Sequence, residues 1–187
     1  MAAPDPRTIR NVIGRLIKDP TDLTLTDGIF GGTQLGLVKQ KVIRVVTRTK
    51  VIRAQEFGSI PVETIRGAHE IALLCELRGW DSDAISAIFP DVTTATASGR
   101  PRINFPGSTR AGAKGTDDAF SLLFAPRNTE EHPALILYKA IPMLAESMEL
   151  RMGRQELSMP VVFMATRDPD SPAKMAEMGL LTDLDVT

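Results

Sequence analysis

Two histidines and one cysteine are the side chains of this sequence best suited to metal binding or nucleophilic catalysis. His69 and His132 lie far apart, and Cys75 is the only cysteine. A zinc site or a thiol-protease site would need a coincidence of folding to assemble from these three residues. We therefore expect His69 to begin a strand, His132 to lie in a turn and Cys75 to be a small core residue. The sequence indicates neither an enzyme nor a bound cofactor or metal.

Two other segments superficially resemble ligand-binding motifs. Residues 107–116 contain glycines and Lys114, but Ala113 stands directly before the lysine, where a phosphate-binding loop has glycine. A flexible basic loop is the better interpretation. Asp168 and Asp170 could hold a hard cation, yet the run Asp-Pro-Asp-Ser-Pro is typical of a turn, and we favour the turn.

A basic strand could contact a nucleic-acid backbone. Arg44, Arg48 and Arg53 lie within one strand-like segment, but no aromatic side chains are interleaved with them to stack on bases. The formal net charge of −1 also excludes a global basic field of the kind that supplies nucleic-acid affinity. We interpret these arginines as strand-edge charges that pair across an interface.

The composition predicts one well-buried domain with extended ends. The chain has 187 residues, of which 43% are hydrophobic and 24% charged, which is near the average for globular proteins. The first ten residues hold prolines and charges where a signal peptide would have an apolar core, and no apolar run approaches the ~18 residues of a membrane span. We expect a soluble protein made in a reducing cytoplasm.

The clearest strand signals lie in two parts of the chain. Residues 39–53 are rich in β-branched side chains, but charged residues interrupt both faces. A strand or hairpin of this kind is typical of a surface or intersubunit sheet, because a long exposed edge is an aggregation hazard in a monomer. Further strands are predicted at residues 70–77, 120–124, 135–140, 148–152 and 157–165, and one helix at residues 82–89.

The remaining segments are predicted to be arms and a loop. Residues 1–26 contain Asp-Pro steps that suit an N-terminal arm more than a core element. Residues 91–118 are polar and rich in turn formers, which predicts a long loop inserted in the β-domain of residues 27–167. Residues 168–187 are acidic, hold two prolines and are predicted to form a C-terminal arm.

The order of these elements resembles that of phage major tail tube proteins and their relatives in contractile injection systems. The resemblance spans roughly residues 28–181. It is carried by Gly31-Gly32-Thr33, the strand region 37–53, the strand 70–77 leading into the helix 82–89, and the late strands 135–140 and 157–165. It rests on order and spacing, since none of these segments is a signature motif.

This resemblance implies a mainly β fold with one helix, a β-sandwich or partial barrel that completes a tube barrel on oligomerisation. Six copies would form a ring, and rings would stack into a hollow tube through which DNA passes. The implied partners are further copies of the chain, a tape measure protein, a tail terminator and, in a contractile tail, a sheath. The implied location is the virion tail, assembled in the host cytoplasm.

The predicted subunit interface lies on the long strand region. Its candidate residues are Val42, Arg44, Val46, Arg48 and Ile52. Tube lumens in the resembled family tend to be acidic, whereas this region is basic. Either its arginines pair with carboxylates such as Glu70, Glu76, Glu149 or Glu156, or the region faces away from the lumen. Alternative functions are another tail component with the tube fold, such as a terminator or hub, and a nucleic-acid-binding β-barrel.

Overall fold

The protein is mainly β with one short helix, as the sequence predicted. The computed structural model describes residues 13–23, 30–54, 60–78, 82–89, 92–97, 100–104, 114–143, 158–167 and 174–184. The strands in these ranges are β1 (Gly14–Lys18), β2 (Thr33–Ala54), β3 (Ile60–Arg78), β4 (Thr93–Ala97), β5 (Arg100–Asn104), β6 (Phe120–Pro126), β7 (Ala134–Met143), β8 (Ser158–Ala165) and β9 (Ala176–Gly179). The helical elements are α1 (Ser82–Ile88) and the 3-10 turns η3 (Gly115–Asp118) and η4 (Leu181–Asp183).

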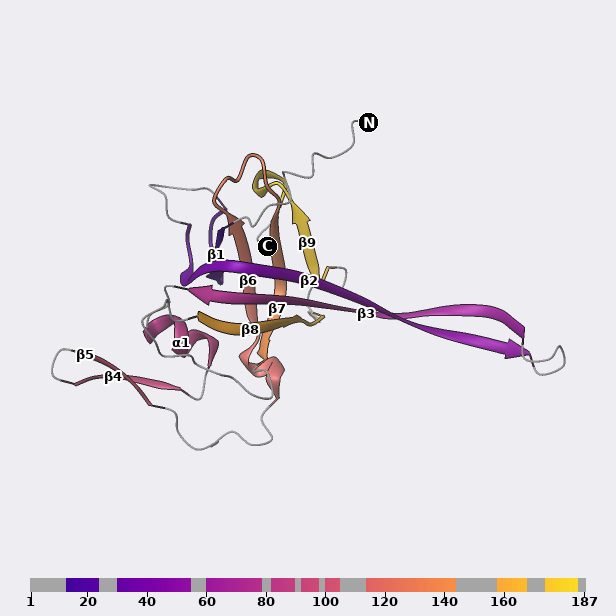
Figure 1. The fold of residues 1–187 in the computed structure, drawn as a ribbon, viewed down its shortest axis with the longest axis horizontal. Helices are drawn as coiled ribbons and strands as arrows, with labels where there is room; N and C mark the ends of the chain where they lie inside the picture. Colours follow the sequence, from indigo (N-terminus) through magenta and orange to yellow (C-terminus); the bar gives the residue numbers. More distant parts are fainter. Residues whose placement is uncertain are drawn as a thin grey trace.

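Six of the strands form an antiparallel β-barrel (Figure 1). Around the barrel the order is β6-β1-β2-β3-β8-β7, and a pairing between β6 and β7 closes it. Three strands are additional: β9 pairs with the first half of β7, and β4 and β5 form a separate two-stranded sheet. Closure matters because it leaves the paired part of each barrel strand without an exposed edge.

The barrel interior is filled by alternate residues of each strand. Along β8, for example, Met159, Val161, Phe163 and Ala165 are buried, while the residues between them are more exposed. Phe163 meets Phe120 of β6 edge to face, with the ring centroids 6.1 Å apart. The period-two pattern predicted for residues 157–165 is therefore confirmed over the described residues of β8, because only one face of this strand meets the core.

The helix α1 packs on the same core. Ala84, Ile85 and Ile88 are buried, and the two isoleucines belong to the main apolar cluster together with Leu77 of β3. The helix predicted at residues 82–89 is confirmed.

The N-terminal segment differs from its prediction as an arm. β1 lies between β2 and β6 in the barrel wall, and Leu16 and Ile17 have 0% exposure. The strand ends at Asp19, which takes a positive φ of 47° before Pro20 and holds β6 through its carboxylate, 3.1 Å from the amide nitrogen of Ser121. The Asp-Pro step therefore ends a barrel strand and does not mark an arm.

The C-terminal segment also differs from its prediction as an arm. β9 pairs with β7, and Leu181 and Leu184 are buried in a second apolar cluster with Ile136. In the same region the hydroxyl of Tyr138 donates a hydrogen bond of 2.5 Å to a carboxylate oxygen of Glu177. Burial of apolar side chains holds this segment against the outside of β6 and β7.

The region predicted to be a long loop contains regular structure. β4 and β5 lie within residues 91–118 and form a hairpin that projects from the barrel near α1, and the 3-10 turn η3 follows it (Figure 1). Most of the glycine-containing segment 107–116 and the whole predicted strand 148–152 lie outside the described residues, as do Asp168 and Asp170. Among the described helical elements, none has the length and apolar character of a membrane span.

Candidate intersubunit surface on the β2–β3 hairpin

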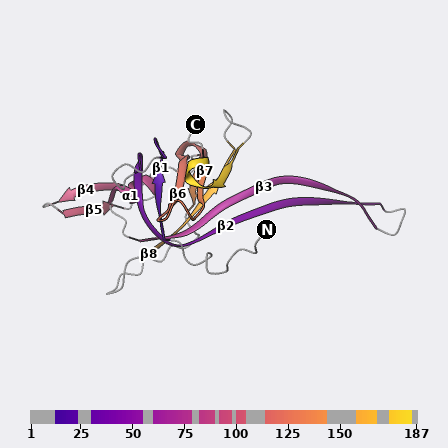
Figure 2. The same cartoon turned by 90° about the horizontal axis from the view of Figure 1, so that it is seen from above.

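The two longest strands form a hairpin that leaves the barrel (Figures 1 and 2). β2 has 22 residues and β3 has 19. β1 pairs with β2 only at Thr33–Val38, and β8 pairs with β3 only at Ile71–Arg78. At about 3.3 Å per residue, the part of β3 before Ile71 extends for roughly 35 Å beyond the barrel wall.

Both outer edges of this projecting hairpin are open in the described structure. From residue 40 to Ala54, β2 pairs with β3 alone, and from Ile60 to residue 70, β3 pairs with β2 alone. Each edge therefore presents a row of backbone N–H and C=O groups. Such edges are templates for pairing with another chain.

Large apolar side chains are exposed on both faces of the hairpin. Val42 and Val45, on opposite faces, are 58% and 60% exposed. The other exposed apolar residues of the hairpin are Ile43, Val46, Val51, Ile52 and Ile65. Several large apolar side chains exposed on one element in this way favour an interaction site.

The five residues predicted to form the interface lie on one face of β2. Because side chains alternate along a strand, Val42, Arg44, Val46, Arg48 and Ile52 all point to the same side of the ribbon. The register with β3 shifts between Thr47 and Thr49, but the additional residue is on β3, so the alternation along β2 continues through the shift. The structure therefore brings the five together on one exposed surface.

A glycine makes the shift in register possible. A Cβ atom at Gly67 would lie 2.7 Å from the carbonyl oxygen of Arg48, which is closer than real Cβ atoms approach backbone. Any other residue would push the two strands apart at this point. Glycine therefore lets the hairpin keep its pairing across the bulge.

Two polar contacts join the strands where the hairpin leaves the barrel. The guanidinium of Arg48 forms an ion pair with the carboxylate of Glu70. The hydroxyl of Thr47 lies 2.9 Å from Nδ1 of His69, within hydrogen-bonding distance. Glu70 is one of the carboxylates expected to pair with the basic strand region, and His69 lies within β3 and not at its start.

The exposed surface continues onto the barrel wall, which the sequence analysis missed. Cross-strand partners place Val42, Leu74, Val162 and Met143 in one row across β2, β3, β8 and β7. Val42 and Met143 are exposed, and the two residues between them are half-buried. The sequence signal that could have revealed this part of the surface is the set of apolar residues at the outward positions of the strand predicted at residues 157–165.

Two groups inside the barrel have altered acidity. Burial raises the pKa of the Cys75 thiol to about 12, which fits its predicted role as a core residue. Burial also lowers the pKa of its cross-strand neighbour Lys41 to about 8. The ammonium of Lys41 lies 3.3 Å from the ring centroid of Phe124, a cation–π contact that partly replaces water.

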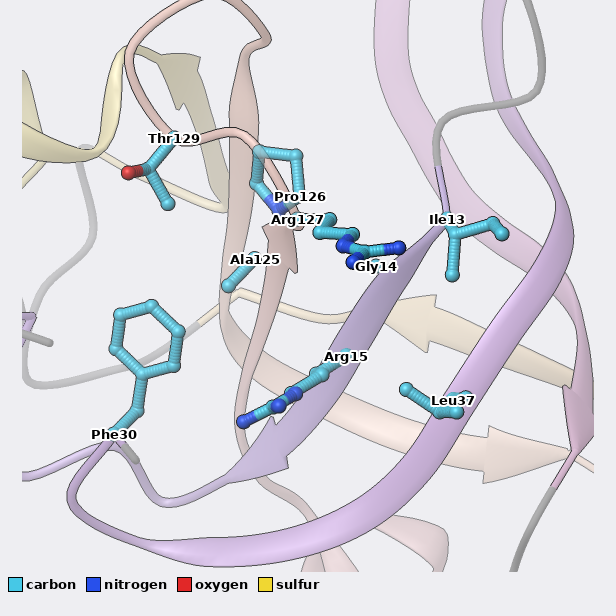
Figure 3. Close-up of a pocket in the computed structure, with 9 residues that line it drawn as sticks. All are labelled: Ile13, Gly14, Arg15, Phe30, Leu37, Ala125, Pro126, Arg127 and Thr129. Carbon is cyan, nitrogen blue, oxygen red and sulfur yellow. The ribbon is translucent and has the colours of Figure 1, made fainter. Parts of the chain in front are cut away.

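The outside of the barrel carries a pocket beside β1 (Figure 3). Its volume is about 430 Å³. Arg15 and Arg127 lie over an apolar lining, and the backbone N–H of Arg127 donates a hydrogen bond of 2.9 Å to the carbonyl of Ile13. The remaining lining residues are Gly14, Phe30, Leu37, Ala125, Pro126 and Thr129.

The residues best suited to chemistry remain apart. His69 lies in β3, and His132 lies in the connection between β6 and β7. In the part of the chain that the structure describes, no three histidine, cysteine, aspartate or glutamate side chains gather as a metal site would require. No protein-family model matches this chain, and no curated protein matches it.

Proposed function

We propose that this protein is a structural subunit that assembles with copies of itself through the β2–β3 hairpin. The observation that carries the proposal is the hairpin's combination of two open edges with apolar side chains on both faces. A surface of this kind is costly to leave in water, at roughly 25 cal/mol per Å² of apolar area. A second chain that covers it would recover this free energy and satisfy the backbone groups of the edges.

The two open edges favour a head-to-tail arrangement. β2 borders one side of the ribbon and β3 the other, so β2 of one copy can pair with β3 of the next. Because the two surfaces differ, this contact is heterologous, and repeated contacts of this type close into a ring when the rotation allows. A ring of paired hairpins would form a continuous sheet around a central channel.

Within this proposal, the assembly is a phage tail tube of stacked hexameric rings through which DNA passes. Its support is the order of elements that resembles tail tube proteins, together with a mainly β fold that has one short helix after the hairpin. The partners would be a tape measure protein, a tail terminator and, in a contractile tail, a sheath. Such a subunit belongs to the virion and needs neither catalysis nor a cofactor.

A nucleic-acid-binding barrel is the competing function from another class. Proteins that bind single strands present aromatic side chains on which bases stack. The described phenylalanines, by contrast, are all buried, at Phe30, Phe89, Phe120, Phe124 and Phe163. The exposed face of the hairpin offers aliphatic and basic groups instead, which suits contact between proteins better.

The proposal is tested by negative-stain electron microscopy of the purified protein at rising concentration. We expect rings or hollow tubes with six-fold end views. Rings that never stack would favour a terminator or hub. A protein that stays monomeric at the highest concentration and binds single-stranded DNA would overturn the proposal in favour of the nucleic-acid-binding barrel.

A further inference from the structure

The pocket beside β1 combines an apolar lining with positive charge. Among the lining residues that the structure describes, Arg15 and Arg127 carry guanidinium groups and none carries a carboxylate. Its volume of about 430 Å³ is within the range of roughly 300–1,000 Å³ that is usual for pockets that receive a ligand. A guanidinium binds a carboxylate with two parallel hydrogen bonds, so an acidic group flanked by apolar groups is the complementary occupant.

The outer half of the hairpin carries a group of this kind. Glu63 is paired across the strands with Ile52, and Ile65 lies two positions along on the same face. All three side chains are exposed. Among the described residues Glu63 has no ion-pair partner, whereas Glu70, another carboxylate of β3, is already paired with Arg48.

The pocket and this face are too far apart in one copy to meet. Glu63 lies toward the end of the hairpin, which projects from the barrel, while the pocket lies on the barrel wall at β1 (Figures 1 and 3). A projection of roughly 35 Å would allow the hairpin to reach a neighbouring subunit. A second copy of the chain can therefore bring a carboxylate and apolar side chains to the pocket.

We propose that the pocket formed by Arg15, Arg127 and their apolar neighbours receives the Glu63 face of the hairpin of a neighbouring copy. This inference rests on the proposed self-assembly and adds a specific docking site to it. The carboxylate of Glu63 pairs with the guanidinium of Arg127, and Ile52 and Ile65 cover the apolar lining. Lys50 shares this face of the hairpin as the cross-strand partner of Ile65, one pair closer to the barrel than Glu63 and Ile52.

A charge swap tests the pairing. Glu63→Arg and Arg127→Glu should each raise the protein concentration needed for assembly about tenfold or more, because each places like charges together. The double variant with both changes should recover most of the loss. The matched control is Thr64→Arg, which introduces an arginine on the same strand but on the opposite face. It should weaken assembly less than Glu63→Arg does, and Arg127→Glu should not rescue it.

A cross-link tests the contact without reference to tubes. Glu63→Cys protein is mixed with Arg127→Cys protein and treated with a short bis-maleimide, because a Glu–Arg ion pair holds the two backbones farther apart than a disulfide can span. Cross-linked dimers are expected in the mixture but in neither protein alone. Thr64→Cys mixed with Arg127→Cys should not cross-link. The native Cys75 is buried and does not compete.

The outcomes separate this inference from the proposed function. A wild-type protein that never assembles overturns the proposed function. If the wild type assembles but Glu63→Arg assembles equally well and the cysteine pair does not cross-link, the docking site is wrong and self-assembly stands. If Arg127→Glu alone prevents assembly, the pocket binds a different acidic segment, and the assignment to Glu63 is wrong.

Discussion

The inner and outer halves of the β2–β3 hairpin consist of the same two strands in different surroundings. In the barrel half of β3, Leu73, Cys75 and Leu77 are buried and the residues between them are half-exposed. In the outer half, the described side chains of residues 63–65 and 67–69 are all exposed. The backbone pairing is the same, so the difference lies in what covers each half.

The proposed self-assembly would account for this difference. In the inner half, β3 lies between β2 and β8 with a core beneath it, and its side chains alternate accordingly. The outer half retains exposed apolar residues such as Val51 and Ile65, but in the described structure it has neither a further strand beside it nor a core beneath it. Apolar residues on both faces of a ribbon are typical of a strand that is covered on both faces, and in the proposed assembly another copy of the chain would cover the outer half.

The largest expected effect is on the folding of the barrel. Phe163→Ala should lower the free energy of unfolding by about 3–5 kcal/mol, because Phe163 has 0% exposure and packs against Phe120. Val45→Ala in the exposed hairpin should change it by no more than about 0.5 kcal/mol. Urea unfolding of the two variants measures both effects. Equal losses would mean that the hairpin is part of the folded core of the monomer.

The next effect is on assembly. Val46→Asp should abolish rings and tubes while changing the free energy of unfolding by less than about 1 kcal/mol, because it places a charge on an exposed surface that becomes buried between copies. Electron microscopy and sedimentation measure the first quantity, and urea unfolding the second.

A matched pair of substitutions controls for exposure. Val42 is 58% exposed in β2, and Met178 is 62% exposed in β9. Val42→Asp should prevent assembly and Met178→Asp should not, since only the first lies on the proposed interface. Tubes of normal length from Val46→Asp or Val42→Asp would show that the hairpin face is not the intersubunit surface.

Two glycines extend the comparison to backbone packing. A Cβ at Gly14 in β1 would lie 2.3 Å from the ring of Phe124, so Gly14→Ala should destabilise the barrel by about 1–3 kcal/mol. Gly67→Ala should leave barrel stability nearly unchanged and weaken assembly, because its clash with the Arg48 carbonyl distorts only the hairpin. Urea unfolding and sedimentation distinguish them, and a barrel destabilised equally by both changes would contradict the separation of the two halves.

The smallest effect concerns pH. The pKa of Lys41 is lowered from 10.5 to about 8 by burial. Between these values the unfolded chain binds a proton that the folded chain releases, so this lysine makes stability rise with pH through that window. The thiol of Cys75 opposite stays neutral there, because burial raises its pKa to about 12. Below pH 8 the Lys41→Met variant is expected to be more stable than the wild type, because it removes the buried ammonium. In urea titrations this advantage should shrink by pH 10.5. A difference in stability between variant and wild type that stays constant with pH would show that the ammonium is not desolvated.

Local patterns were sufficient for the elements that alternate or turn within a short stretch. The helix at residues 82–89 and the strand at residues 157–165 were predicted because their periodicity is visible in the sequence itself. β1 was missed because a five-residue strand has little periodicity, and its place is set by pairing with residues more than a hundred positions away, such as Gly14 with Pro126.

The candidate interface was likewise only partly predictable from the sequence. Five exposed residues on one face of β2 could be predicted because mixed faces on a long strand indicate an interface. The distance by which the hairpin projects from the barrel could not be predicted, because it depends on where β1 and β8 stop pairing with the hairpin. The pocket was not predicted either, because Arg15 and Arg127 are distant in sequence and meet only when the barrel closes.

Amide hydrogen exchange before and after assembly tests most directly whether the hairpin is the intersubunit surface. In the monomer, the amides of β2 beyond residue 40 and of β3 before Ile71 should exchange much faster than those of the barrel strands, because their outer edges are open. On assembly, these same amides should become strongly protected. Rings or tubes in which the hairpin amides exchange as fast as in the monomer would contradict the account.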